Sequence, residues 1–287
     1  MKNIFTRSAQ FDPLNNYLFF KIFGEKGDEI QLLGFINAVL GRKEDERFTS
    51  VEILENTTFM AEIIGGKSCT LDVRAKLPNG AMVNVEVQLS DQHNMNRRSL
   101  FYLTREYSRR LKAGENYSEL PDLIAINLVD YDFPATRNYH SCFHLREDTE
   151  QEVILTNSLE IHYINMVKYR KLVRKNHDRQ DLNDPLYRWL VWFDRNSPPE
   201  LIEEVVKMDE AIKTADDMIF SFAMTDDEMD YWFRRKLFQM DRENEIKYAR
   251  AEGQAKGIEK GQQNVFNLLD QGFSIEEIKR RLTQTTS

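Results

Sequence analysis

The chain lacks the features that mark secreted and membrane-spanning proteins. It has 287 residues but only two cysteines, Cys69 and Cys142, which are too few for a disulfide framework and indicate a reducing, cytoplasmic setting. It has no run of about 18 apolar residues, so no segment is predicted to span a membrane. Its first residues carry no apolar signal-peptide core. A net charge of −8 argues against a generally basic nucleic-acid coat protein, although it allows a local basic patch.

Several catalytic signatures are missing as well. The sequence contains no Gly-x-Ser-x-Gly nucleophile elbow and no glycine loop that would cradle phosphates. Its five histidines show no zinc spacing with the two cysteines. His140 and His144 lie four residues apart in a strand-like segment, so we interpret them as surface or core residues.

The residues that are present predict an α/β fold. Hydrophobic residues make up 41% of the chain and aromatic residues 11%, which is enough for a large core. Helical spacing of apolar residues predicts helices over 27–42 and 95–112. Strands are predicted over 51–64, 71–77, 81–89, 121–131, 138–145 and 159–167. We therefore expect an α/β core over 1–172, a helical extension over 173–240 and a charged helical tail over 241–287.

The tail carries glycine at every fourth position, at Gly253, Gly257 and Gly261. Each interior glycine costs a helix about 1 kcal/mol relative to alanine, so three on one stripe need a reason. Close helix–helix contact in a homo-oligomer is one reason, and a weakly ordered, solvated tail is the alternative. The segment 268–282 that follows predicts a helix-turn-helix-like pair, with Gly272 at the bend.

The segment LDVRAKLPNGAMVNVEVQL (71–89) is predicted to form a β-hairpin. A two-residue Asn-Gly turn would place every apolar side chain opposite a polar one, so burial excludes that register. A three-residue loop over 78–80 pairs Leu77 with Ala81 and keeps the apolar side chains on one face.

This register places Asp72 opposite Glu86, with β-carbons roughly 4.5–5.5 Å apart. Two carboxylates this close can bind a divalent cation, share a proton, or be solvated with Arg74 reaching diagonally to Glu86. A magnesium ion needs few protein ligands, so Asp72, Glu86 and the backbone carbonyl of Val87 would suffice. Such an ion can activate water against a phosphodiester.

The helix after the hairpin is strongly basic. Between residues 97 and 112, six basic residues stand against the single acidic Glu106. The basic residues are Arg97, Arg98, Arg105, Arg109, Arg110 and Lys112. Several of them share one stripe with Tyr102 at helical spacing, which favours contacts with the DNA backbone. The alternative is a solvated face that interacts with the acidic remainder of the protein.

The order of these blocks resembles the Rpn-type recombination-promoting nuclease and transposase family, within the PD-(D/E)XK nuclease superfamily. The similar blocks are NNYLFFKIFGEKGDEIQLLGFINAVLG (15–41), LDVRAKLPNGAMVNVEVQ (71–88), RRSLFYLTREY (97–107), AGENYSELPDLIAINLVDY (113–131), LEIHYINMVKY (159–169) and the glycine-spaced tail. The resemblance implies a restriction-endonuclease-like mixed sheet flanked by helices, followed by a helical C-terminal region.

The same resemblance implies roles for individual residues. Asp72 and Glu86 would be the ligands of Mg²⁺ or Mn²⁺, and Gln88 would orient the attacking water where the superfamily usually has lysine. Glutamine can hydrogen-bond a water but supplies no positive charge. Arg98 and Tyr102 match the family's Arg-x3-Tyr motif.

Two further residues are accessory candidates. Lys21 falls on the family's lysine, and the alternative for it is a solvated surface lysine on an amphipathic helix. Glu62, on the preceding strand, is a candidate accessory metal ligand. Asn16 stands where the family often has an acidic residue, a departure that would weaken a metal site using that position.

The leading hypothesis is a magnesium-dependent DNA endonuclease linked to recombination, transposition or defence. The second hypothesis is a catalytically weak or inactive DNA-binding or assembly protein on the same fold. A third, a protein-interaction module, depends on the tail.

Overall fold

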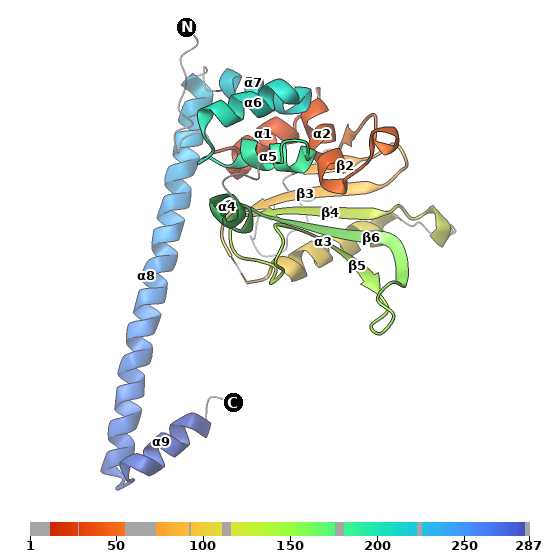
Figure 1. Cartoon of the computed structure of the whole chain (residues 1–287). Coiled ribbons are helices and arrows are strands. Elements are labelled where there is room, and N and C mark those ends of the chain that lie inside the picture. The colour runs from red at the N-terminus through yellow and green to blue at the C-terminus, as the bar shows by residue number, and fades with distance from the viewer. Residues whose placement is uncertain are drawn as a thin grey trace. The chain divides into compact units, whose positions relative to one another are not determined.

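The computed structural model contains a mixed β-sheet with flanking helices (Figure 1). The structure describes residues 12–27, 29–54, 73–91, 93–110, 116–175, 181–222 and 226–284. Within these ranges the sheet has six strands: β1 (Glu52–Ile53), β2 (Val73–Lys76), β3 (Met82–Gln88), β4 (Leu123–Val129), β5 (His140–Arg146) and β6 (Ile154–Asn165). The helices are α1 (Asn16–Phe23), α2 (Ile30–Leu40), α3 (Met95–Arg110), α4 (Met166–Lys175), α5 (Pro185–Phe193), α6 (Pro199–Met208), α7 (Glu210–Phe222), α8 (Asp226–Asp270) and α9 (Ile275–Gln284), with short 3-10 turns at Glu44–Glu46 and Tyr117–Glu119.

The strand order is β1-β2-β3-β4-β6-β5. Strands β1, β2 and β3 pair antiparallel, β3, β4 and β6 run parallel, and the edge strand β5 pairs antiparallel with β6. The predicted mixed α/β sheet with flanking helices is confirmed. The run LIAINLV forms β4, which is buried along its whole length, as expected for a central parallel strand.

The hairpin between β2 and β3 has the predicted register. Val73 pairs with Val85 and Ala75 with Val83. The loop closes through the backbone, where Gly80 N–H donates to Leu77 O at 2.9 Å and Leu77 N–H donates to Ala81 O at 2.8 Å. Gly80 has φ +89°, which glycine adopts more readily than any other residue. Because Asp72 lies outside the described residues, its pairing with Glu86 stays a prediction.

The two faces of the sheet are covered by different helices (Figure 1). Helices α1, α2, α5 and α7 share one core with the inward side chains of β2, β3 and β4, and that core is rich in aromatic rings. Its largest fully buried side chains include Trp189, Trp192, Phe35 and Phe23. Helix α3 covers the opposite face, where Leu103 packs against Met82, Leu123 and Ala125.

Helix ends follow the sequence signals. Helix α2 ends at Gly41, which takes the left-handed conformation (φ 61°) and donates its N–H to the last turn. Asp184 caps α5, since its side chain accepts the backbone N–H of Leu186 at 2.9 Å.

The chain divides into two compact units, Met1–Met224 and Thr225–Ser287. In the first unit, α2 packs against both α5 and α7. The divisions predicted at 172 and 240 stay predictions.

The second unit consists of helices α8 and α9, joined at Gly272, which has φ +84°. A β-carbon at Gly253, Gly257 or Gly261 would meet no other atom within 4 Å. The predicted helical C-terminal region is confirmed, and association through it stays a prediction. Within the described segments, none of the helices is long and apolar enough to cross a membrane.

Candidate functional site

Glu86 lies in β3 on the sheet face that α3 covers. Only 4% of the residue is exposed. The strand register places Asn127 of β4 beside Glu86, and Tyr163 of β6 beside Asn127. Because neighbouring residues in register project to the same face, a row of polar side chains crosses three strands beneath α3.

Arg98 of α3 reaches down to this row. One terminal guanidinium nitrogen donates to Glu86 Oε1, and the other donates to Gln88 Oε1 at 3.3 Å. The guanidinium carbon also lies 5.9 Å from the ring centroid of Tyr102, one helical turn further on. Tyr102 is buried, with 4% of the residue exposed, and its ring lies beneath the guanidinium of Arg98.

A buried hydrogen-bond chain positions α3 over the sheet. Ser99 Oγ donates to Asn127 Oδ1 at 2.8 Å, and Asn127 Nδ2 donates to the backbone carbonyl of His162 at 3.1 Å. The hydroxyl of Tyr163 approaches Ser99 Oγ at 3.5 Å. Since Ser99 follows Arg98 directly, these bonds also hold the arginine near Glu86. Asn127 was not among the predicted site residues, although it is the only polar residue in LIAINLV and lies in register with Glu86.

Burial dominates the electrostatics of Glu86. Loss of water raises the pKa of its carboxyl to about 7, and the charge of Arg98 offsets only part of that rise. An arginine at hydrogen-bond distance therefore leaves the negative charge incompletely balanced. A divalent cation would offset the remaining cost of burying this charge. The Glu86 carboxylate is also the kind of hard oxygen ligand that Mg²⁺ and Mn²⁺ prefer.

Tyr131 follows β4 and lies near the same region. Its hydroxyl oxygen is buried and makes no hydrogen bond within the described part of the chain. Burial is the main reason why the pKa of Tyr131 is raised, and the charges of Asp91 and Glu86 raise it further. The hydroxyl is therefore a neutral donor close to the carboxylate.

Gln88 is engaged at both ends of its amide. Its oxygen accepts from Arg98, and its nitrogen donates to the carbonyl of Ser90 at 3.0 Å. Gln88 therefore helps to orient the guanidinium in this structure. Its predicted contact with an attacking water stays a prediction.

Several of the remaining predicted site residues lie outside the part of the chain that the structure describes. Asp72, Glu62 and Lys112 lie outside the described residues, and the side chain of Arg109 is not described. The side chain of Val87 is buried in the core beneath the α1–α2 layer.

Arg97 and Arg110 are exposed on α3, and Arg105 is half-buried. Lys21 forms an ion pair with Glu25 at 2.6 Å. The buried Oδ1 of Asn16 makes no hydrogen bond with other described residues. The predicted DNA-binding surface and accessory roles stay predictions.

A family model described as "PD-(D/E)XK nuclease family transposase" matches residues 13–249, which include the six described strands and helix α3. No curated protein and no solved structure matched the chain.

Proposed function

Because the chain belongs to the PD-(D/E)XK nuclease family transposases, we propose that it is a metal-dependent DNA endonuclease that acts in recombination or transposition. The observation that carries this proposal is the buried Glu86 carboxylate beneath α3, in contact with Arg98 and only partly neutralised by it. Carboxylates whose pKa is raised by burial beside a specific charged partner cluster at functional sites.

Asp72 and Glu86 are the proposed ligands of Mg²⁺ or Mn²⁺, with the backbone carbonyl of Val87 as a third. The register of the described hairpin supports this choice, because one further pair beyond Val73 and Val85 would bring Asp72 opposite Glu86. When bound, the cation would lower the pKa of a water and stabilise the charge that develops on the phosphodiester.

Arg98 is the proposed phosphate-binding residue. In the absence of a cation its guanidinium compensates Glu86. A cation on Glu86 would take over that compensation, and the same N–H groups could then turn to a phosphate oxygen. Gln88 would keep the guanidinium at the site and present its second amide N–H to the attacking water.

The exposed arginines of α3 extend this surface along the DNA backbone. Arg97 and Arg110 are exposed, and together with Arg105, Arg109 and Lys112 they would contact phosphates without reading sequence. We expect DNA affinity to fall steeply with salt, and Arg98→Ala to weaken it.

Plasmid cleavage tests the proposal. The purified chain is incubated with supercoiled plasmid and Mg²⁺ or Mn²⁺, and compared with Asp72→Asn and Glu86→Gln. The control is Glu119→Gln, which changes an exposed carboxylate in the 3-10 turn Tyr117–Glu119. We expect wild type and the control to cut, and both site variants to lose about 100-fold or more in rate. Full cleavage by either site variant would reject this site.

A catalytically inactive DNA-binding or assembly protein is the second candidate. It is favoured by Gln88, whose amide already contacts Arg98 and Ser90, and by Asn16 in place of an acidic residue. It predicts DNA binding in gel shifts without product formation, and no calorimetric heat when Mg²⁺ is added.

Self-association through residues 241–287 is proposed separately. Helix α8 exposes the apolar side chains of Ile258 and Phe266, at 59% and 60%. Light scattering on the full chain and on a chain ending at residue 240 tests this, since only the full chain should form a homo-oligomer.

A further inference from the structure

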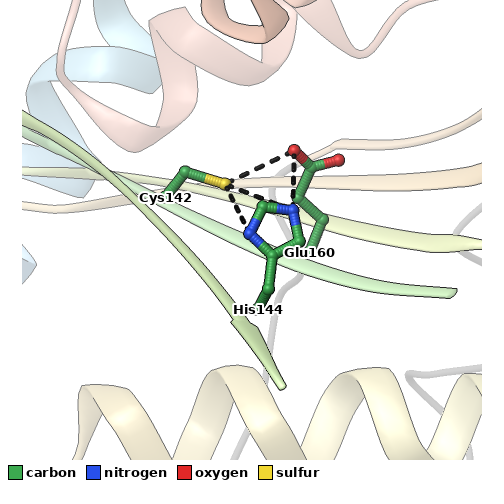
Figure 2. Close-up of side chains that lie close together, drawn as sticks. All are labelled: Cys142, His144 and Glu160. Atoms are coloured by element: carbon green, nitrogen blue, oxygen red, sulfur yellow. Dashed lines mark hydrogen bonds and ion pairs between the residues drawn. The ribbon is translucent and has the colours of Figure 1, made fainter. Parts of the chain in front are cut away.

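A second group of chemically active side chains lies on the other face of the sheet, at its β5 edge (Figure 2). Cys142 of β5 pairs in register with His162 of β6. His144 follows Cys142 by two residues and Glu160 precedes His162 by two, and residues two apart in a strand face the same side. The antiparallel pairing therefore brings four potential metal ligands together.

This group is separate from the Glu86 site. In the register of β4 and β6, His162 aligns with Ile126, whereas Tyr163 aligns with Asn127. Ile126 belongs to the core beneath the α1–α2 layer, while Asn127 bonds to Ser99 of α3. His162 and Glu86 therefore project from opposite faces of the sheet.

The ligand atoms lie close together. Cys142 Sγ lies 3.4 Å from Glu160 Oε1 and 3.7 Å from His162 Nε2, and these last two atoms are 3.2 Å apart. A histidine binds one zinc ion through one nitrogen, and Nε2 of His144 lies 4.0 Å from the sulfur and 3.6 Å from Glu160 Oε1. Cys142, His144 and Glu160 each have a ligand atom within 4.8 Å of the other two.

We propose that Cys142, His144, Glu160 and His162 form a zinc-binding site that fastens the edge strand β5 to β6. Zinc–ligand bonds of about 2.3 Å to sulfur and about 2.0–2.1 Å to nitrogen and oxygen define a tetrahedron. Its edges are about 3.6 Å from sulfur to a nitrogen or oxygen ligand, and about 3.3 Å between nitrogen and oxygen ligands. The five separations given above lie within about 0.4 Å of these lengths.

A zinc-bound histidine commonly donates a hydrogen bond from its other ring nitrogen, and His140 is placed to accept such a bond from His162. Nε2 of His140 lies 3.0 Å from His162 Nδ1, and the two rings stack at 5.2 Å. As a neutral imidazole, His140 can accept the Nδ1 proton of His162, which leaves Nε2 of His162 able to bind metal.

The contacts within the group suit a cation. In this structure the thiol of Cys142 donates to Glu160 Oε1 at 3.4 Å. A bound zinc ion would displace the thiol proton to solvent and pair with the thiolate and the carboxylate.

The ligand set selects zinc over the cation proposed for Glu86. Thiolate and imidazole ligands suit zinc, whereas Mg²⁺ prefers oxygen. The position gives the ion a structural task, because the β5–β6 pairing is irregular from Phe143 to Arg146. Four protein ligands across two strands would restrain this edge, as closed zinc sites do.

Cobalt binding tests the site independently of any nuclease activity. The full chain is freed of metal with a chelator and titrated with Co²⁺, whose thiolate complexes give a charge-transfer absorption band. Wild type should bind one Co²⁺ with this band, and Zn²⁺ should displace it. Cys142→Ser, a near-isosteric change at an exposed position, should abolish the band. His140→Ala should weaken Co²⁺ binding about 10-fold while keeping the band.

The matched control is Cys69→Ser, the same change at the only other cysteine. This control should bind Co²⁺ as wild type does. The proposal is overturned if wild type shows no thiolate band, or if the band survives Cys142→Ser and disappears in Cys69→Ser.

Discussion

A close contact between helices α2 and α7 in the larger unit allows a quantitative prediction. Gly34 of α2 faces Ala211 of α7, and a β-carbon at position 34 would lie 2.4 Å from the Ala211 β-carbon. It would also lie 3.6 Å from Trp189 Cζ2, which is ordinary contact. Because ordinary carbon contacts begin near 3.4 Å, Gly34→Ala must move the two helices about 1 Å apart.

The free energy of unfolding should fall despite the better helix propensity of alanine. Replacing glycine by alanine in a helix gains about 1 kcal/mol. Overpacking of a close-packed core costs about 1–3 kcal/mol, and backbone-borne methyl groups leave little room to relax. The upper end of that cost, about 3 kcal/mol, less the gain of about 1 kcal/mol in helix propensity, gives an expected destabilisation of about 2 kcal/mol for Gly34→Ala.

The exchanged variant provides the decisive comparison. Ala211→Gly alone should cost about 2 kcal/mol, from lost helix propensity and one buried methyl group. Gly34→Ala combined with Ala211→Gly moves the methyl group to the facing helix, so its stability should return to within about 1 kcal/mol of wild type. Urea unfolding followed by tryptophan fluorescence measures all four proteins. Additive losses in the double variant, or an unchanged Gly34→Ala, would show that the helices are not in this contact.

Three further predictions concern the site and the tail. If α8 is solvated, Gly257→Ala should stabilise the helix by about 1 kcal/mol, because alanine has the better helix propensity. If Gly257 instead lies in a close helix–helix contact, the same variant should lose the homo-oligomer in light scattering. In EDTA, the free energy of unfolding of wild type, measured with urea relative to Glu86→Gln, should fall by up to about 3 kcal/mol between pH 4.5 and 8. The reason is that the pKa of Glu86 is about 7 in the folded protein and ordinarily 4.5, so ionisation of this carboxyl is penalised in the fold. A difference that does not change with pH would contradict the burial of this carboxyl. Tyr131→Phe should stabilise the protein by roughly 1 kcal/mol in thermal unfolding, since its buried hydroxyl makes no hydrogen bond among the described residues, and a lower melting temperature would mean that the hydroxyl has a partner.

Local patterns predicted the elements and the hairpin register. The alternation in β2 and β3 and the Pro-Asn-Gly loop left only one register with all apolar side chains on one face, and Val73 does pair with Val85. Gly41 ends α2, and the apolar run of β4 is buried on both faces. These features depend on neighbours within a few residues or across a short turn, so the sequence carries them directly.

The partners of the site residues could not be predicted in the same way. Arg98 was expected on a DNA-facing stripe of α3, and the fold brings it onto Glu86 and Gln88. Asn127 is adjacent to Glu86 because β3 and β4 are parallel neighbours, and no short spacing in the chain encodes that pairing.

The sequence by itself determined where the helices and strands form and how the hairpin closes, because side-chain periodicity and turn chemistry act over short distances. Only the tertiary structure decided which distant residues meet. The antiparallel pairing of β5 with β6 joins Cys142 and His144 to Glu160 and His162. The same residues at these spacings carry no zinc signature in the linear chain, since the ligand geometry arises from two strands placed side by side.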